Sequence, residues 1–338
     1  MPISYAVIGT GWITDSWISA ATKSGKWQLQ AVYSRTKEQA DSFASKHNCT
    51  NTHTSLQSLG ADKSVQAVYI ASPNNLHYAQ AKKMLQAGKH VILEKPATST
   101  PAELDDLFRT AKAHNLFLIE AFRHIQEANF RALQRLVRDE KRLGPIYGAS
   151  LTYASYSSRY NDVLAGREPN IFSLAHSGGS LVDIGVYPIS FAVALFGAPK
   201  SATYVPFITR TGVDGGGVIV LAYDAFGVQI NQAKCYTSTA PCEVYGEKGT
   251  LVVNGTTDLK SFRFVDARSK ASEEWAGECK TVEKPNVNME EECVEFARIV
   301  EEGDGRAAEA LERVSRDVVK VTSELRRQAG VRYPADEA

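Results

Sequence analysis

The chain has 338 residues, with 38 basic residues against 38 acidic ones and a formal net charge of zero. This balance disfavours a general nucleic-acid-binding protein, which carries an excess of lysine and arginine. At roughly 100–200 residues per domain, the length favours two domains, each with its own core. The longest apolar runs, such as 67–71 and 218–223, are far shorter than the roughly 18 residues of a membrane span, so no integral membrane protein is expected.

The N-terminus and the cysteines bear on cellular location. A buried-strand pattern begins at residue 3, which leaves no room for an export signal ahead of it. The five cysteines are scattered and form no Cys-x-x-Cys pair; they are Cys49, Cys235, Cys242, Cys279 and Cys293. We therefore expect reduced, structural thiols in a cytoplasmic protein, with neither a disulfide framework nor a zinc site. The spacing of His, Cys and Asp predicts no metal site either.

Short apolar segments and amphipathic helical patterns alternate over the first 120 residues. The strand candidates cover 3–9, 29–34, 65–71, 90–94 and 116–121, and the helix candidates cover 12–24, 37–47, 76–87 and 101–114. The strands carry Val, Ile and Leu at consecutive positions, as parallel strands buried on both faces do. This alternation predicts an α/β fold with an N-terminal Rossmann domain, a doubly wound parallel sheet, over residues 1–122.

The pattern changes after residue 122. A long amphipathic helix is predicted over 125–141, and helices at 289–302 and 307–327 close the chain. Between them lie strand candidates with alternating polarity, at 147–156, 202–209, 218–223, 228–235, 242–245 and 250–253. Turn signals separate the strands, including the glycine-rich segment Asp214–Gly217. Residues 123–338 are therefore expected to form an α+β domain with an open, mostly antiparallel sheet.

A glycine-rich turn follows the first predicted strand. Gly9, Thr10 and Gly11 lead directly into the first helix, whose first residues are Trp12 and Ile13. In this context, glycines let the backbone approach a dinucleotide pyrophosphate at the helix N-terminus. A purely structural turn is the alternative interpretation. We expect these five residues to contact a dinucleotide cofactor.

The end of the second predicted strand bears on the choice between NAD and NADP. An NAD-binding chain usually has an acidic residue there, which accepts hydrogen bonds from the ribose 2′-hydroxyl. This chain has Ser34, Arg35 and Thr36 instead. A guanidinium and two hydroxyls suit a 2′-phosphate. The sequence therefore predicts NADP as the cofactor, with NAD as the alternative.

Polar residues follow the next two predicted strands. Ser72, Asn74 and His77 come after one of them, and Glu94 and Lys95 come after the other. In open α/β sheets, ligands bind at the carboxyl ends of the strands, where these residues lie. A lysine at such a place is more often a solvated surface residue, but the proline that follows this one stiffens the turn.

A glycine pair at 178–179 precedes a second candidate segment. Asp183 and Tyr187 follow it with a spacing of four, which would place them on one face of a helix. An acid and a phenol together can support proton transfer. A buried tyrosine that is satisfied by the aspartate is the structural alternative.

In this order and spacing, the segments GTGWIT, SPNNLH, EKP and GGSLVDIGVYP resemble the glucose–fructose oxidoreductase/inositol dehydrogenase family, Gfo/Idh/MocA. The resemblance covers roughly residues 3–330. It implies a Rossmann domain followed by a substrate-binding domain whose open sheet often mediates oligomers. We therefore expect a homodimer through the outer face of the C-terminal sheet.

Tyr187 stands where many members of this family have a histidine. In this respect the chain is similar to the branch that contains dimeric dihydrodiol dehydrogenase and NADP-dependent D-xylose dehydrogenase. The histidine-containing inositol dehydrogenases form another branch, so the tyrosine disfavours inositol as the substrate.

The resemblance implies hydride transfer between nicotinamide C4 and a sugar, a sugar-like carbonyl or a vicinal diol. Tyr187 is expected to act as the general acid in reduction and as the base in oxidation. A free phenol is a poor base at neutral pH, so a cation must stabilise the phenolate. Lys95 is the candidate for that cation and for a hydrogen bond to the substrate oxygen. Asp183 is expected to orient the lysine or a substrate hydroxyl.

The resemblance also assigns contacts around the reacting groups. Ser72, Asn74, His77 and Glu94 are expected to line the nicotinamide and its ribose, with a solvent-facing residue at a helix start as the alternative for His77. Arg123 is expected to meet the cofactor or the substrate, with packing on a helix surface as the alternative. A polar, aromatic loop at 155–172 is expected to form a substrate wall, with an ordinary surface loop as the alternative. Its candidate contact residues are Tyr156, Arg159, Tyr160 and Asn161.

Two functions remain open at this stage. The first is an NADP-dependent oxidoreductase for a small polyhydroxylated or carbonyl substrate. The second is a non-catalytic, NADP-binding sensor or regulator with the same fold. The presence of Lys95, Asp183 and Tyr187 together favours the enzyme, because a sensor has no chemical need for them.

Overall fold

The computed structural model describes residues 1–274 and 288–337. The chain divides into two compact units. The first unit contains Met1–Arg123 and Val287–Arg316, and the second contains His124–Asn286 and Asp317–Ala338. The sequence places everything after residue 122 in one C-terminal domain. The structure differs, because the chain returns to the first unit near its end.

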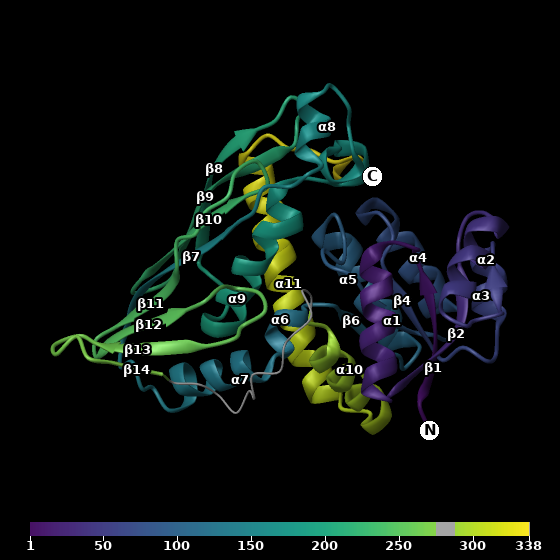
Figure 1. Ribbon diagram of the computed structural model, residues 1–338, viewed down its shortest axis with the longest axis horizontal. Coiled ribbons are helices and arrows are strands. Elements are labelled where there is room, and N and C mark those ends of the chain that lie inside the picture. Colours follow the sequence, from purple (N-terminus) through teal and green to yellow (C-terminus); the bar gives the residue numbers. More distant parts are fainter. Residues whose placement is uncertain (275–287, 338) are drawn as a thin grey trace. The chain divides into compact units, whose positions relative to one another are not determined.

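A parallel sheet forms the centre of the first unit (Figure 1). In the part of this unit that the structure describes, six strands pair in the order β3-β2-β1-β4-β5-β6, every pair parallel. The strands are β1 Ile3–Ile8, β2 Trp27–Tyr33, β3 Thr52–His53, β4 Ala67–Ile70, β5 His90–Leu93 and β6 Leu118–Glu120. The chain order reverses between β1 and β4, as in a doubly wound sheet. The predicted Rossmann architecture is confirmed.

Helices connect these strands. They are α1 Trp12–Ser24, α2 Lys37–Lys46, α3 Leu56–Ala61, α4 Asn74–Gln86 and α5 Pro101–Ala113, with α10 Glu290–Glu302 added from the end of the chain. Helix α4 packs against α5, and α1 packs against α10. The sequence prediction omits β3 and α3, since two and six residues are too few for a clear period.

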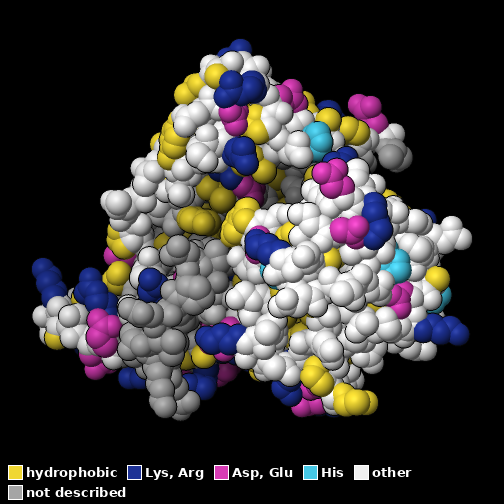
Figure 2. All heavy atoms as spheres, turned by 45° about the vertical axis from the view of Figure 1, so that its right-hand side comes forward, with side chains coloured by type: hydrophobic (Ala, Val, Ile, Leu, Met, Phe, Trp, Pro, Cys, Tyr) yellow, Lys and Arg dark blue, Asp and Glu magenta, His cyan; other side chains and the backbone are white. Residues whose placement is uncertain are grey.

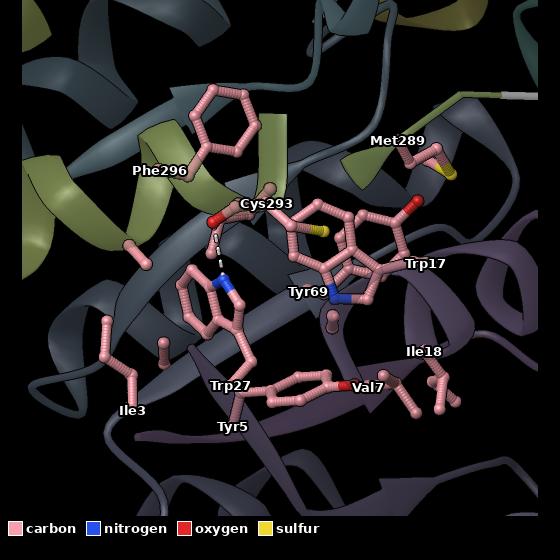
Figure 3. Packing of buried hydrophobic residues seen from close by; sticks show 14 of the residues in the cluster. Ile3, Tyr5, Val7, Trp17, Ile18, Trp27, Tyr69, Met289, Cys293 and Phe296 are labelled. Atoms are coloured by element: carbon pink, nitrogen blue, oxygen red, sulfur yellow. Dashed lines mark hydrogen bonds between the residues drawn. The ribbon is translucent and has the colours of Figure 1, made fainter. Parts of the chain in front are cut away.

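An aromatic cluster explains why α10 belongs to the first unit (Figure 3). The indole of Trp17, on α1, stacks on Tyr69 with ring centroids 4.3 Å apart. Trp17 also contacts Phe296 on α10, with centroids 6.4 Å apart. The Trp27 indole N–H donates to the Cys293 carbonyl at 2.8 Å. Burial of these large rings stabilises the return of the chain to this unit.

The second unit contains a mixed sheet. Within the described residues, its order is β14-β13-β12-β11-β7-β10-β9-β8. Only the β7–β10 pair is parallel in this order, and the other pairs are antiparallel. The strands are β7 Ile146–Ala154, β8 Ser201–Ile208, β9 Asp214–Ala222, β10 Gly227–Ala233, β11 Cys242–Gly246, β12 Gly249–Val253, β13 Phe262–Asp266 and β14 Ser272–Glu274. The predicted open, mostly antiparallel sheet is confirmed.

Shorter and longer helices complete the second unit. They are α6 Arg123–Gln126, α7 Ala128–Gln134, α8 Tyr160–Leu164 and α9 Val186–Phe196; the long helix α11, Gly305–Gln328, begins in the first unit and ends in the second. Helix α9 packs on β7 and β10 and buries one face of the sheet. Side chains on that face are fully buried; examples are Leu151, Ile219, Ile230 and Val244.

The predicted long helix at 125–141 is wrong. It is divided into α6, α7 and a π-helical turn, Arg135–Asp139. Glu127 interrupts it with an extended backbone, and its buried carboxylate accepts a hydrogen bond from the Leu259 amide at 2.5 Å. The side-chain Nδ2 of Asn129 donates to the Leu259 carbonyl at 2.8 Å. These tertiary hydrogen bonds stabilise the break more than the local helix preference of the sequence opposes it.

The glycine-rich segment Asp214–Gly217 is also not the predicted turn, because it begins β9. A Cβ on Gly216 would lie 2.6 Å from the Ala233 Cβ, and one on Gly217 would lie 2.3 Å from the Val205 carbonyl oxygen. The glycines therefore allow neighbouring strands to approach closely.

Two observations bear on the protein classes that the composition disfavours, nucleic-acid-binding proteins and integral membrane proteins. On the face that Figure 2 shows, basic and acidic side chains lie interspersed. Among the described residues, the helical stretch Leu174–Phe196 is long and apolar enough to be considered as a membrane span, but 83% of its apolar window is buried in the structure. That burial is what a core helix of a globular unit shows.

Candidate functional site

The dinucleotide turn lies between β1 and α1 in the first unit. Gly9 has φ of +108°, and a Cβ there would lie 2.4 Å from the Ala71 carbonyl oxygen. Only glycine fits this position. Gly11 is the N-cap of α1 without a side-chain cap, so the amides of the first turn face outward as an anion site would need. Trp12 is 68% exposed beside them.

The end of β2 is connected to this turn through Gln39, which the sequence prediction misses. The Ser34 hydroxyl donates to the Gln39 Oε1 at 2.9 Å, and the Gln39 Nε2 donates to the Thr10 hydroxyl at 2.9 Å. Thr36 caps α2 and accepts from the Gln39 amide. The Thr-x-x-Gln spacing of a capping box is the sequence signal that could have identified Gln39.

An open hollow of about 360 Å³ lies beside this bridge. Its walls come from the dinucleotide turn and from α2, namely Thr10, Thr36, Glu38, Gln39, Ser42, Phe43 and Lys46. Arg35 is exposed at the end of β2. Hydroxyls, an amide and a cation beside the turn suit a phosphorylated ribose.

His77 joins the ends of two strands. Its ring is 1% exposed, with Nδ1 2.9 Å from the Pro96 carbonyl oxygen and Nε2 2.9 Å from the Ser72 carbonyl oxygen. Burial lowers the pKa of His77, while the two carbonyls oppose that effect. The ring therefore supports the loops after β4 and β5 from within. Asn74 lies half-buried at the start of α4, directly after the first of these loops.

Two buried carboxyl groups accompany Lys95. Glu94 accepts from the Tyr69 hydroxyl at 2.7 Å and from the Lys95 amide at 3.1 Å. Burial raises the pKa of Glu94, and the Lys95 cation lowers it in part. Glu120, at the end of β6, accepts from the Ala97 amide at 2.8 Å, and burial raises its pKa to about 7. The sequence prediction misses Glu120, although an acid at the end of a buried strand is a recognisable signal.

Arg123 is buried in the first unit. Its guanidinium donates to the Asn288 carbonyl at 3.4 Å. Its charge also lowers the pKa of Glu94, although by less than burial raises it. Arg123 thus belongs to the same charged group as Lys95 and Glu94, and its contact with a cofactor or substrate stays a prediction.

In the second unit, the segment after the glycine pair is not a plain α-helix. Leu181–Gly185 forms a π-helical turn, and α9 continues from Val186. The spacing argument that puts Asp183 and Tyr187 on one α-helical face therefore does not apply as stated. π-helical turns are uncommon and frequent at functional sites.

Exposure distinguishes Asp183 and Tyr187 from their neighbours. Every other residue in 180–195 is buried, whereas these two are half-buried. The Tyr187 ring packs edge-on against His124 and Tyr153, with centroids 5.1 and 5.6 Å apart. The His124 Nε2 lies 2.9 Å from the Ser190 hydroxyl. The phenol is therefore held by rings on both α6 and β7.

Asp183 forms an ion pair with Lys234, a residue that the sequence prediction misses. The sequence predicts that Asp183 orients Lys95 or a substrate hydroxyl. Lys234 follows β10, and its side chain is 7% exposed against 27% for Asp183. Val228, Ile230, Gln232 and Lys234 alternate onto the buried face, so the period of two could have indicated an inward lysine.

The loop at 155–172 reaches this ion pair through ring contacts. The Tyr156 hydroxyl donates to the Asn161 Oδ1 at 2.7 Å, and the Tyr156 and Tyr160 rings lie 5.9 Å apart. Tyr160 packs on Phe172 at 5.7 Å, and the Lys234 Nζ lies 6.0 Å from the Phe172 ring centroid. The structure thus connects three of the four predicted wall residues to Asp183.

The fourth wall candidate, Arg159, points elsewhere. Its side chain is 68% exposed and lies 4.0 Å from Asp162. A pair this exposed contributes little to stability.

The described cysteines form no disulfide. Cys49, Cys235, Cys242 and Cys293 are free thiols. Burial raises the pKa of each, that of Cys235 to about 11. A raised pKa leaves little of the nucleophilic thiolate at neutral pH, so these thiols are weakly reactive. Cys279 lies outside the described residues. Within 1–274 and 288–337, no three His, Cys, Asp or Glu side chains are grouped as metal ligands.

Known proteins resemble this fold and this sequence. The chain is 38% identical to scyllo-inositol 2-dehydrogenase (NADP(+)) IolU of Bacillus subtilis, over 99% of this chain and 100% of that protein. It is 28% identical to the trans-1,2-dihydrobenzene-1,2-diol dehydrogenase of Mus musculus, over 75% of this chain and 79% of that protein. The crystal structure of the 3-ketoreductase KijD10 from Actinomadura kijaniata with NADP has a TM-score of 0.79 at 22% identity and covers 97% of this chain and 98% of that one.

The comparison with IolU does not support the interpretation that Tyr187 disfavours an inositol substrate, because a relative matched over nearly the whole chain is named for scyllo-inositol. One residue type at one position is too little to assign a substrate.

Two family descriptions match the chain. "Oxidoreductase family, NAD-binding Rossmann fold" matches residues 3–122, and "GFO/IDH/MocA C-terminal domain" matches residues 130–252. Together with the full-length identity to IolU, these matches confirm the resemblance drawn from the four motifs. The chain belongs to the Gfo/Idh/MocA family of oxidoreductases.

Proposed function

We propose that the protein is an NADP-dependent oxidoreductase for a polyhydroxylated substrate, with a cyclitol, a sugar or a vicinal diol as the substrate class. The observation that carries this proposal is the exposure of Asp183 and Tyr187 alone within the buried segment 180–195. An acid and a phenol that reach solvent from a core segment are available for proton transfer. The name of IolU supports a ring polyol and NADP.

The first unit fits a dinucleotide. Gly9 lets the turn pack directly against the Ala71 carbonyl, and the N-terminus of α1 at Gly11 has no side-chain cap, so its amides are available to a pyrophosphate. The hollow beside Thr10 and Thr36 suits the ribose end. When bound, NADP supplies or accepts the hydride at nicotinamide C4. Gly9–Ile13, Ser34, Arg35 and Thr36 would hold its phosphates, and Ser72, Asn74 and Glu94 would line the nicotinamide side.

Proton transfer is assigned to Tyr187. The phenol donates a proton to the substrate oxygen in reduction and accepts one in oxidation. Lys95 supplies the positive charge that stabilises the phenolate and the developing alkoxide. Asp183 accepts hydrogen bonds from substrate hydroxyls and so orients the substrate.

The test is a spectrophotometric screen at 340 nm with the purified protein. The panel contains NADP⁺ and NAD⁺ with cyclitols, aldoses and trans-dihydrodiols, and NADPH with the corresponding ketones and dicarbonyls. Turnover of one class supports the proposal and identifies the substrate. Tight NADPH binding without turnover of any class would contradict it and favour the sensor.

Arg35→Asp is expected to reverse the cofactor preference. The substitution removes a 2′-phosphate donor and adds an acceptor for a 2′-hydroxyl, so KM for NADPH should rise at least about 10-fold while KM for NADH falls. The kcat/KM ratio for the two cofactors is the measurement. Arg109→Asp, at an arginine that is 74% exposed on α5, is the matched control and should leave the ratio unchanged. An unchanged ratio in Arg35→Asp would contradict NADP selection by this residue.

The outer face of the second unit's sheet supports a homodimer. Val205 on β8 lies opposite Val218 on β9, and both are exposed, as is Val220. Exposed valines in register on one sheet face form an apolar surface that a second copy can cover.

Val205→Glu with Val220→Glu is therefore expected to convert a dimer into a monomer, because two charges would be buried in the interface. Light scattering of the purified protein measures the mass. Val294→Glu, at a valine on α10 with 43% exposure, is the control and should stay dimeric. A wild-type monomer at working concentration would reject the dimer.

We also propose the cytoplasm as the location, which the free thiols of the described cysteines support. Activity in the soluble fraction of the source cells, without release from the periplasm, is the expected result of fractionation.

A further inference from the structure

We propose that Lys234 is a positioning residue for the reaction: it fixes the Asp183 carboxylate in its ionised form as the acceptor of substrate hydroxyls. The inference rests on the proposed function, in which Asp183 orients the substrate. It adds a lysine of the second unit that none of the family motifs in this chain contains.

The two members of the ion pair differ in access to solvent. The Lys234 side chain is 7% exposed and that of Asp183 is 27% exposed. The carboxylate can therefore meet a ligand, whereas the ammonium lies beneath it. A residue that cannot reach the substrate itself can still act through the group that does.

The backbone around Lys234 is held on two sides. Its amide donates to the Gly215 carbonyl of β9 at 2.8 Å, and its carbonyl accepts from the Ser157 amide at 2.9 Å. A Cβ on Gly215 would lie 2.4 Å from the Cys235 sulfur, so the two strands meet closely at this point. The ammonium is consequently presented from backbone that is fixed at the end of an interior strand, as a supporting residue should be.

Stability alone does not explain a lysine at this position. Val228 and Ile230, which precede it on the same buried face, are apolar, and Gln232 between them and Lys234 is buried but neutral. A buried ion pair is often no more stable than apolar residues of similar volume, because both charges lose their hydration. A buried lysine that is paired with a half-buried aspartate therefore points to a role for its charge.

Lys234 also connects Asp183 to the predicted substrate wall. Its Nζ lies 6.0 Å from the Phe172 ring centroid, and Phe172 packs on Tyr160. The same ammonium thus contacts the segment that carries Tyr187 and the loop that carries the polar wall residues. Movement of this segment or of this loop would change the direction of the Asp183 carboxylate.

The chemistry of the pair suits neighbouring hydroxyl groups. An ionised carboxylate only accepts hydrogen bonds and can take one from each of two vicinal hydroxyls. Without a cation beneath it, a half-buried carboxyl group is more easily protonated and then also donates. Lys234 thus selects substrates with adjacent hydroxyls over those with a single one.

The test compares Lys234→Met, Lys234→Gln and Lys234→Arg in the full-length enzyme, with the substrate found in the screen. We expect Lys234→Met and Lys234→Gln to lower kcat/KM about 10–100-fold, mainly through a higher KM, because an oriented charged hydrogen bond is lost. Lys234→Arg should recover most of the loss. The Kd for NADPH, measured by fluorescence, should stay unchanged.

Two further variants exclude a merely structural role. Lys200→Met removes the lysine of another Lys–Asp ion pair in the second unit, one that is exposed, and should leave kcat/KM unchanged. In an Asp183→Asn background, Lys234→Met should add little further loss, because the two residues act as one unit. Wild-type kinetics in the Lys234 variants, or full additivity with Asp183→Asn, would overturn the inference while the proposed function stands. An inactive wild-type enzyme across the whole panel would overturn both.

Discussion

Replacing Tyr187 by phenylalanine is expected to lower kcat about 10²–10⁴-fold, the usual contribution of a general acid–base residue. The change removes only the hydroxyl. The ring that packs against His124 and Tyr153 stays in place, so the free energy of unfolding should change by less than about 1 kcal/mol. Steady-state kinetics at saturating NADP⁺ and substrate give kcat, and thermal unfolding checks the fold.

Tyr236→Phe is the matched control for this variant. Tyr236 also lies in the second unit, is 39% exposed, and donates its hydroxyl to Asn231. Its loss should leave kcat within about twofold of wild type, as surface substitutions do. If Tyr187→Phe retained more than about a tenth of kcat, another group would have to move the proton.

The sequence could predict the first unit well because its signals are local. Short runs of Val, Ile and Leu, bounded by Gly9 or Pro96, define strands and turns within a few residues. The capping residues Thr100 and Glu103 mark the start of α5, and both side chains make the hydrogen bonds of a capping box. Each of these features depends on neighbours in the chain, so one sequence is sufficient.

Long-range contacts account for what the sequence could not predict. The return of α10 to the first unit depends on contacts between Phe296 and Trp17, which are far apart in the chain. The break at Glu127 depends on the Leu259 amide, 132 residues later. No local period encodes either of these contacts.

In the candidate site, too, local signals could be read from the sequence and long-range contacts could not. Asp183 and Tyr187 are recognisable because they follow a glycine pair in a known motif. For Lys234 the period of two indicates only an inward side chain; its ion pair with Asp183 depends on the folding that brings β10 to the π-helical turn. Asp214, which supports the same turn from β9, was interpreted as part of a glycine-rich turn.

Asp214 leads to the second large expected effect. Its Oδ2 accepts from the Leu181 amide at 2.7 Å and from the Tyr204 hydroxyl at 2.8 Å. A Cβ on Gly179 would lie 2.4 Å from its Oδ1, so the glycine makes room for the carboxyl group. This buried carboxyl group therefore anchors the start of the turn that carries Asp183.

The sign of the pH effect follows from the pKa of Asp214. Burial raises it from 3.8 to about 6, and hydrogen bonds from Tyr204 and Leu181 offset only part of this. The folded state therefore binds the proton more tightly than the unfolded state. The stabilising contribution of the protonated group is complete below pH 3.8 and is lost as the pH rises through about 6. The loss amounts to about 3 kcal/mol, at about 1.4 kcal/mol per pKa unit.

Asp214→Asn should remove this loss, because an amide does not ionise. Between pH 4 and 7.5, urea unfolding of both proteins should show the free energy of unfolding of the asparagine variant rising by about 2.5 kcal/mol relative to that of wild type; the remainder of the effect lies below pH 4. The difference in unfolding free energy between variant and wild type is plotted against pH. Altered hydrogen bonding in the variant shifts this difference curve by a constant amount and leaves its slope unchanged. Asp224→Asn, at an exposed aspartate in the same unit, should give a flat difference curve. If the curve for Asp214→Asn is equally flat, this carboxyl group does not titrate between pH 4 and 7.5, and the turn that carries Asp183 rests on an anion throughout that range.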